Sequence, residues 1–351
     1  MPETPRGRGT ALNPTNRFDE LAYEWEESAD PAERPAPKTR FFRDASKSII
    51  TKNDSPDISF TYSVNPYRGC EHGCVYCYAR PYHEYLGLSA GLDFETMIFV
   101  KEDAPELLAE ELSKPSWVPD TIALGGVTDC YQPVERKLEV TRRCLQVLAD
   151  ARNPCGLVTK NALVTRDIDV FQDLAAHGGV RIYVSLTTLD AELARRMEPR
   201  ASTPENRLEA MRTLAKAGVP VGVMTAPMIL GLNDHEMPKL LEAAADAGAT
   251  SAGYVPLRLP HQLGGLFKAW LAEHYPDRAA KVMNQIAAIR GGGTNDPRFG
   301  TRMTGEGIFA VHLAKLFSLT CKRLGLNRAR LATMDATAFR RPLRNGQMRL
   351  L

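Results

Sequence analysis

The sequence lacks the features of secreted and membrane proteins. No apolar stretch follows a basic N-terminal start, as a secretory signal peptide would require. The longest weakly polar run, residues 218–232, is too short and too interrupted by proline and glycine to cross a bilayer. We therefore expect a cytoplasmic protein with no membrane partner.

Net charge and cysteine content are also low. The net charge of +2 identifies neither nucleic acid nor membranes nor acidic ligands as partners. Seven cysteines in 351 residues do not form a disulfide scaffold. What is present is an apolar fraction of 44% and a charged fraction of 25%, which fit a globular protein with a sizeable core.

Composition divides the chain into three parts. Residues 1–60 are rich in proline and show little periodicity, which predicts a partly disordered extension that does not carry the chemistry. Residues 61–257 form the predicted core domain, and residues 258–351 a C-terminal helical segment with a basic tail. An acidic stretch from Asp19 to Glu33 and a basic one from Lys322 to Arg349 indicate either a tail that faces a polyanion or solvated termini.

The core region alternates short apolar runs with amphipathic stretches. The apolar runs predict buried strands at residues 121–124, 156–159, 180–186, 219–224 and 251–255. The amphipathic stretches predict helices at residues 104–112, 134–151, 167–177, 204–217 and 234–247. This alternation is typical of parallel βαβ units in an open sheet or a barrel, and we predict an α/β fold with a partial (β/α)6-type parallel barrel. Further helices are expected at residues 261–290 and 307–324.

Three cysteines lie within eight positions, in the spacing C-x3-C-x2-C. Thiolates from Cys70, Cys74 and Cys77 can converge on one metal centre, and Gly69 and Gly73 give the loop the freedom to wrap it. A [4Fe-4S] cube held by three thiolates leaves one iron open to another ligand, as catalysis requires.

Two other interpretations of the cysteines remain. The first is a structural zinc site with His72 or a remote cysteine as fourth ligand, and the second is burial of the cysteines as small apolar residues. Zinc sites usually add a second pair of cysteines, whereas the other cysteines here are scattered singly. We therefore favour the iron-sulfur cluster and expect His72 to be an ordinary loop residue.

These residues resemble the signature of the radical S-adenosylmethionine (radical SAM) superfamily, in which an aromatic residue such as Tyr76 accompanies the cysteines. Residues 65–67, 74–78 and 128–135 are similar to the spore photoproduct lyase-like branch. The resemblance implies a [4Fe-4S] cluster that binds S-adenosylmethionine and, with one electron from a flavodoxin- or ferredoxin-type donor, cleaves it to a 5′-deoxyadenosyl radical. The radical then abstracts a hydrogen atom from the substrate.

The resemblance also implies which residues bind the cofactor. Gly125 and Gly126 are similar to the family's glycine-rich segment near the methionine amino group, and Lys160 to a lysine directed at the methionine carboxylate. The remaining cofactor-binding candidates are Tyr76 beside the adenine, Ser185 at the ribose or carboxylate, and Arg200 at a carboxylate or paired with Glu198. For each of these residues a structural role in a turn or an ion pair is the alternative.

The sequence departs from the lyases at the first strand end. The lyases are understood to return a hydrogen atom from a cysteine just before a Thr-Ser-Asp run, and this cysteine is absent here. Cys130 is a candidate substitute, and the alternative is a buried core cysteine. Asp129 and Tyr131 are the other catalytic candidates, since polar groups at this position suit hydrogen bonds to a base, a peptide or a metabolite.

Three hypotheses of function follow. The leading one is a radical SAM enzyme with an unidentified substrate. The second, within the same chemistry, is an enzyme that acts on nucleic acid, with Arg258, Arg298 and Arg302 contacting phosphates. The third is a non-enzymatic iron-sulfur or zinc protein used for electron transfer or structure.

Overall fold

The structure is a computed structural model that describes residues 4–19, 37–328 and 334–343. The acidic stretch after Asp19 and parts of the basic C-terminal stretch lie outside the described residues.

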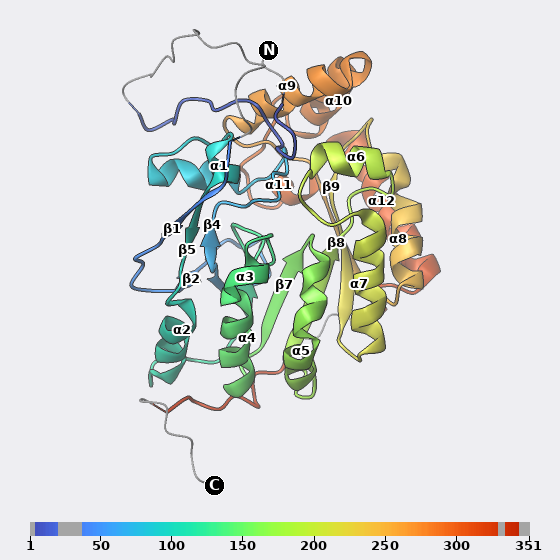
Figure 1. The fold of residues 1–351 in the computed structure, drawn as a ribbon. Helices are drawn as coiled ribbons and strands as arrows, with labels where there is room; N and C mark the ends of the chain where they lie inside the picture. Colours follow the sequence, from blue (N-terminus) through green and yellow to red (C-terminus); the bar gives the residue numbers. More distant parts are fainter. Residues whose placement is uncertain (1–3, 20–36, 329–333, 344–351) are drawn as a thin grey trace.

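A seven-stranded sheet forms the centre of the fold, with the strand order β10-β9-β8-β7-β6-β3-β2. Its parallel strands are β3 (Tyr62–Val64), β6 (Ile122–Leu124), β7 (Cys155–Thr159), β8 (Val180–Ser185), β9 (Val221–Met228) and β10 (Ser251–Pro256). The edge strand β2 (Ile50–Lys52) pairs antiparallel with β3. The predicted α/β fold and partial barrel are therefore confirmed, and Figure 1 shows the strands rising toward the end where the cysteine loop lies.

Helices that follow the strands cover the outer face of this sheet, as the βαβ pattern predicts. They are α2 (Ala104–Ser113), α4 (Val140–Asp150), α5 (Ile168–Ala175), α7 (Pro204–Lys216) and α8 (Met237–Asp246). Thr203 caps α7 by accepting a hydrogen bond from the Asn206 backbone N–H at 3.3 Å. The predicted helix 134–151 is divided into α3 (Glu135–Leu138) and α4 because Glu139 between them has a φ of 51°.

A second, three-stranded sheet lies beside the main one in the order β1-β5-β4. Its strands are β1 (Arg40–Arg43), β4 (Tyr67–Arg68) and β5 (Met97–Val100). The sequence did not predict these strands, because each has at most four residues and too little alternation to read. Part of the N-terminal extension is thus paired into sheets, through β1 and β2.

The C-terminal segment is helical, as predicted. Its helices are α9 (Leu263–His274), α10 (Pro276–Ile289), α11 (Thr301–Thr304) and α12 (Gly307–Leu324). The main sheet's two edges, β2 and β10, are not neighbours in the strand order. Asp57, which follows β2, meets α11 through an ion pair with Arg302, with Nε 2.7 Å from the carboxylate.

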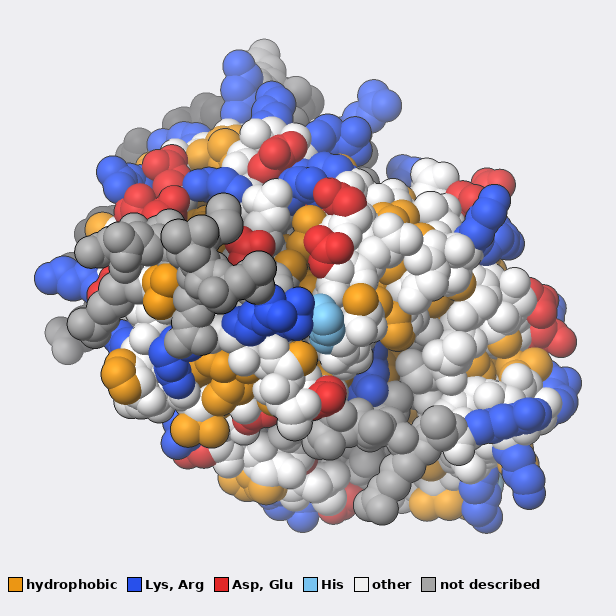
Figure 2. All heavy atoms as spheres, turned by 90° about the horizontal axis from the view of Figure 1, so that it is seen from below, with side chains coloured by type: hydrophobic (Ala, Val, Ile, Leu, Met, Phe, Trp, Pro, Cys, Tyr) orange, Lys and Arg blue, Asp and Glu red, His pale blue; other side chains and the backbone are white. Residues whose placement is uncertain are grey.

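Residues 334–343 run across the lower end of the molecule in Figure 1. The Arg341 guanidinium donates there to the carbonyls of Leu112 at 3.3 Å and Trp117 at 3.1 Å, so this basic residue has a structural role. Figure 2 views that end and shows basic, acidic and apolar side chains interspersed. Among the helices described, none is long and apolar enough to cross a membrane.

Candidate active site

The three predicted cluster ligands lie together in the loop between β4 and the 3-10 helix η2 (Arg80–Leu86). The loop turns tightly at Gly69 and Gly73, whose φ values of 80° and 67° favour glycine. Cys70 and Cys74 are each 6% exposed, and the thiols are near enough to one another to interact electrostatically. The loop therefore gathers the thiols in one buried place.

Burial changes the chemistry of these thiols. It raises the pKa of Cys77 to about 11 and that of Cys74 well above its ordinary value. A free thiol in this environment stays protonated at neutral pH, whereas a bound metal deprotonates the thiol that ligates it. The thiols are thus suited to a site in which metal binding supplies the compensating positive charge.

The arrangement fits a cube better than a single metal ion. Among the described residues, no three His, Cys, Asp or Glu side chains converge closely enough to hold one ion. A zinc ion needs such convergence around itself, whereas each thiolate of an iron-sulfur cube ligates its own iron atom.

Arg80 fixes the cysteine loop through hydrogen bonds to backbone carbonyls. Its fully buried guanidinium donates to the carbonyls of Cys74 at 2.9 Å and Gly91 at 2.8 Å, and pairs with the buried Glu95 carboxylate. These are charge-assisted hydrogen bonds inside a low-dielectric core, so they fix the backbone of the loop strongly.

The N-terminal extension closes over the same loop. The Gly9 backbone N–H donates to the Glu95 carboxylate at 2.9 Å. A Cβ atom at Gly9 would lie 1.7 Å from the Gly73 carbonyl oxygen, which leaves no room for any side chain. The extension thus covers the cysteine loop by a contact between two backbones.

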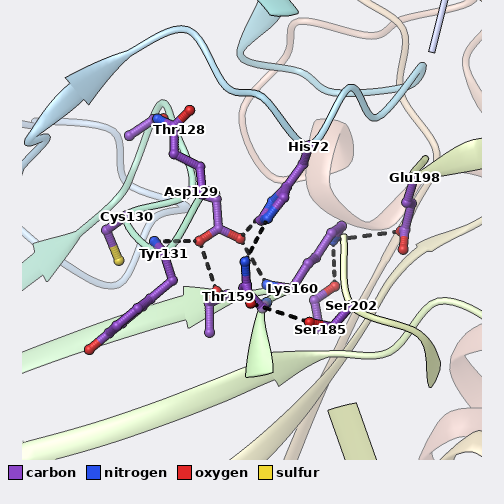
Figure 3. Close-up of polar contacts among 12 residues, drawn as sticks. His72, Thr128, Asp129, Cys130, Tyr131, Thr159, Lys160, Ser185, Glu198 and Ser202 are labelled. Atoms are coloured by element: carbon purple, nitrogen blue, oxygen red, sulfur yellow. Dashed lines mark hydrogen bonds and ion pairs between the residues drawn. The ribbon is translucent and has the colours of Figure 1, made fainter. Parts of the chain in front are cut away.

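His72 links the cysteine loop to the ends of the strands, a role that the sequence did not predict. Its Nδ1 atom lies 3.2 Å from the Asp129 carboxylate, and its ring is buried. That carboxylate accepts hydrogen bonds from the Lys160 backbone N–H and the Thr159 hydroxyl, each at 2.8 Å. Figure 3 shows His72 and Asp129 pointing toward each other. The available signal in the sequence was a histidine between two of the cysteines, and only the fold shows its partner, Asp129.

Lys160 and Ser185 meet at the ends of β7 and β8, as the cofactor-binding prediction requires. The Lys160 ammonium donates to the Ser185 hydroxyl at 2.6 Å and lies 5.8 Å from the centre of the Tyr76 ring. The Glu198 carboxylate is 3.9 Å from the same ammonium (Figure 3). Lys160 therefore lies near Tyr76 of the cysteine loop, with the Glu198 carboxylate also close by.

Glu198 is a second residue whose part in the site the sequence missed. Its buried carboxylate accepts hydrogen bonds from the Tyr76 hydroxyl and from the Thr187 hydroxyl, the latter at 2.9 Å, and pairs with Arg207. Burial alone would raise the pKa of Glu198, but Arg207 and Lys160 hold it at about 2. The carboxylate is thus ionised, and its charge is balanced inside the protein.

The glycine pair lies at the end of β6. Gly125 has a φ of 82°, and a Cβ atom there would meet the Thr128 carbonyl oxygen at 2.9 Å, so the turn itself requires glycine. The Gly126 carbonyl accepts a hydrogen bond from the Tyr78 hydroxyl at 2.6 Å. Cofactor contact by this pair stays a prediction beside the structural role seen here.

The other predicted residues lie outside the group formed by Lys160, Ser185 and Tyr76. Arg200 pairs with Glu71 at 2.8 Å, so the expected pair with Glu198 is wrong. Cys130 is fully buried in the core, and in Figure 3 it lies on the other side of Asp129 from Lys160. The Tyr131 hydroxyl donates to Asp167 at 2.8 Å, also away from Lys160. The catalytic roles of Cys130 and Tyr131 stay predictions that this geometry does not favour.

The arginines expected to contact phosphates have different surroundings. Arg298 pairs with Asp296 at 2.8 Å, and Arg302 pairs with Asp57. Arg258 instead lies over the Tyr78 ring, with its guanidinium carbon 5.5 Å from the ring centre. Internal carboxylates therefore already neutralise two of the three cations.

The fold and the cysteine loop together define an α/β enzyme whose site lies at the strand ends of a partial barrel. The chain belongs to the Radical SAM superfamily, whose family model matches residues 64–244. It is 38% identical over 238 residues to uncharacterized proteins of Mycobacterium bovis and Mycobacterium tuberculosis, covering 67% of this chain and 70% of each relative. A Methanocaldococcus jannaschii protein is 26% identical over 65% of this chain and 82% of its own length.

Solved structures of spore photoproduct lyase share the fold. One variant of that enzyme superposes with a TM-score of 0.56 at 16% identity, covering 82% of this chain and 80% of the lyase. The lyase complexed with dinucleoside spore photoproduct has a TM-score of 0.50 at 18% identity, covering 67% of this chain and 66% of the lyase. The likeness identifies the fold and leaves the substrate of this chain open.

Proposed function

We propose that Cys70, Cys74 and Cys77 hold a [4Fe-4S] cluster with which the protein cleaves S-adenosylmethionine reductively and abstracts a hydrogen atom from a substrate. The observation that carries the proposal is the link from the cysteine loop through His72 and Asp129 to the backbone of Lys160. This link fixes three thiols and a lysine ammonium at the same end of the barrel, where ligands of parallel α/β folds bind.

The cluster and cofactor, when bound, would supply the one-electron cleavage that generates a carbon radical. The protein's own residues do the binding. The Lys160 ammonium is suited to pair with the methionine carboxylate, because Glu198 already has Arg207 as a partner and lies at the longer distance of 3.9 Å. Ser185 holds the ammonium in place through its hydroxyl.

The apolar neighbours of the loop would keep water out of the site. Val75 and Tyr76 pack with Leu193, Ile229 and Leu232 in one buried cluster. A dry site strengthens the electrostatic contacts of the cofactor and protects a radical from side reactions.

The finer parts of the function are proposals as well. The external electron donor is of the flavodoxin or ferredoxin type, and the protein works in the cytoplasm. Nucleic acid is the substrate class that we favour, supported by the fold that this chain shares with a lyase whose structure contains a dinucleoside photoproduct.

Anaerobic reconstitution with iron and sulfide tests the cluster. We expect about four iron and four sulfide per chain, a loss of both in Cys70→Ala, Cys74→Ala and Cys77→Ala, and an unchanged content in Cys155→Ala, whose cysteine is buried at the start of β7. Reduced wild-type protein should then form 5′-deoxyadenosine from S-adenosylmethionine. A non-enzymatic iron-sulfur or zinc protein would form none, and retention of the cluster by any of the three variants would refute the proposed ligands.

A further inference from the structure

A row of exposed aromatic side chains runs along the surface beside the cysteine loop. Large apolar residues this exposed are informative when they are contiguous, because single ones are common on any protein. Tyr82 and Tyr85 project from η2, whose other face buries His83 and Glu84. The members of the row, which we call the aromatic row, are in spatial order Arg17, Phe18, Tyr85, Tyr82, Tyr78 and Arg258.

Each ring of the aromatic row lies next to another ring of the row in space. The ring centres of Phe18 and Tyr85 are 5.1 Å apart, and those of Tyr85 and Tyr82 are 6.4 Å apart. Tyr82 also lies near enough to Tyr78 for the two hydroxyl groups to interact electrostatically. The exposed fractions are 54% for Phe18, 67% for Tyr85, 52% for Tyr82 and 45% for Tyr78. Ring surface is thus open to solvent at each position.

An arginine lies at each end of the aromatic row. The guanidinium carbon of Arg17 is 4.7 Å from the Phe18 ring centre and 5.5 Å from that of Tyr85. At the other end Arg258 lies 5.5 Å from the Tyr78 ring centre. Of these two cations, Arg17 has the buried Glu84 carboxylate at 3.5 Å, whereas no carboxylate within the described residues pairs with Arg258.

The aromatic row leads to the proposed active site. Tyr78 follows Cys77 directly and donates its hydroxyl hydrogen bond to Gly126 at the end of β6. Arg258 lies just beyond β10, at the same end of the barrel. A ligand that covers the row therefore reaches the strand ends where the chemistry is proposed.

We propose that the aromatic row is a stacking platform for a single-stranded segment of nucleic acid; this rests on the proposed function and deepens it by specifying single strands as the substrate and the surface that binds them. Bases stack on tyrosine and phenylalanine rings regardless of sequence, while arginines contact the phosphates between them. A row of rings with cations at its two ends provides both interactions in one line.

The features of the row favour nucleic acid over a peptide. A peptide that adds a strand needs an exposed strand edge and a helical peptide needs an apolar groove, and η2 offers neither; the proline-rich peptides that do dock on aromatic rings carry no phosphates for the two arginines. Within the part of the chain that the structure describes, the Tyr82 and Tyr85 hydroxyls have no hydrogen-bond partner, so they remain open to the polar edges of bases and sugars.

Fluorescence anisotropy with labelled oligonucleotides of about 12 nucleotides tests the proposal. Oligothymidylate and oligouridylate separate DNA from RNA, and a duplex of the same length measures the preference for single strands. We expect the double variant Tyr82→Ala/Tyr85→Ala to bind the preferred single strand roughly tenfold or more weakly. Arg258→Gln should weaken binding and lower the salt slope by about one.

Two further variants keep the result interpretable. Tyr82→Trp retains a stacking surface and should keep the wild-type affinity. Phe41→Ala removes an aromatic ring that is 48% exposed on β1, outside the row, and should also bind normally. Tighter binding of the duplex, an unchanged affinity of the double variant, or an equal loss in Phe41→Ala would overturn the proposal.

A protein partner on the same surface is another outcome that would overturn it. In that case the double variant would slow reduction of the cluster by a flavodoxin-type donor while its oligonucleotide affinity stayed normal. Formation of 5′-deoxyadenosine is measured separately on the wild-type protein, so failure of the platform and failure of the proposed chemistry are distinguishable.

Discussion

His72 and Asp129 form a buried contact, with Nδ1 of the histidine 3.2 Å from the carboxylate and side-chain exposures of 1% and 11%. Burial alone would lower the pKa of His72, but the Asp129 carboxylate, together with Cys70 once that residue is deprotonated, raises it to about 10. Burial would raise the pKa of Asp129, but His72 holds it at about 2. The contact is thus an ion pair between the cysteine loop and the strand ends.

A double-mutant cycle with His72→Gln and Asp129→Asn measures this ion pair. We expect each single variant to lower the free energy of unfolding by about 3 kcal/mol, because it leaves a buried charge without its partner. The coupling energy should be about 1–3 kcal/mol, and the double variant should be less destabilised than the sum of the singles predicts. Urea unfolding measures all four proteins, and strict additivity would contradict a direct pair.

Gly9→Ala tests the backbone contact over the cysteine loop. The new Cβ atom would lie 1.7 Å from the Gly73 carbonyl, so either the extension or the loop must move. We expect the reconstituted variant to hold less than half of the wild-type iron. The matched control is Gly265→Ala within α9, where no atom lies within 4 Å of the added Cβ; it should keep its iron and gain up to about 1 kcal/mol in stability.

Lys160→Met tests the role of the ammonium. The variant should bind S-adenosylmethionine about 10- to 100-fold more weakly, since hydrogen bonds to charged groups contribute about 1.5–3 kcal/mol. Its fold should persist, because Glu198 keeps Arg207 as a partner. Equilibrium dialysis of the reconstituted protein gives the affinity, with the exposed Lys239→Met as control. Equal affinities in both variants would mean that Lys160 has only the structural role.

His83 should make stability depend on pH. Burial lowers the pKa of this histidine to about 4 from 6.5 in the unfolded chain. Between these values the unfolded chain binds a proton that the folded protein does not, so stability is complete above pH 6.5 and falls as the pH drops toward 4. The loss between neutral pH and about pH 5 should be roughly 2 kcal/mol.

His83→Gln removes the titrating group while an amide can still donate to the Met97 carbonyl, which lies 3.0 Å from Nε2 of the histidine. Urea unfolding of the cluster-free protein at both pH values should therefore show a smaller loss in this variant than in the wild type. His312→Gln on the exposed surface of α12 should lose as much stability as the wild type. A slope unchanged in His83→Gln would assign the pH dependence to other groups.

The main sheet and the helices around it could be predicted from the sequence because their apolar residues recur with regular periods. Strands such as β8 and helices such as α12 lie within a few residues of the predicted bounds. The cysteine loop could be predicted for a different reason. Its three cysteines lie within one short segment, so their spacing can be recognised without knowing the fold.

The remaining parts of the site depend on contacts between distant segments. Glu198 and Tyr76 are 122 positions apart, and Gly9 and Glu95 are 86 apart, so no local pattern announces either pair. Arg200 shows that closeness in the sequence can also mislead. Its neighbour Glu198 in the sequence suggested an ion pair, but the backbone directs Arg200 to Glu71 instead.

The barrel is open on one side, because its edge strands β2 and β10 are not hydrogen-bonded to each other. Between β2 and β10 the Asp57 to Arg302 ion pair takes the place of a continuous ladder of backbone hydrogen bonds. Widening this seam would break the contacts that Asp57 makes with Arg302 and with the Gly300 backbone N–H, whereas separating two paired strands would break a whole row of backbone hydrogen bonds. The seam between β2 and β10 is therefore easier to widen than any junction between hydrogen-bonded strands of the sheet.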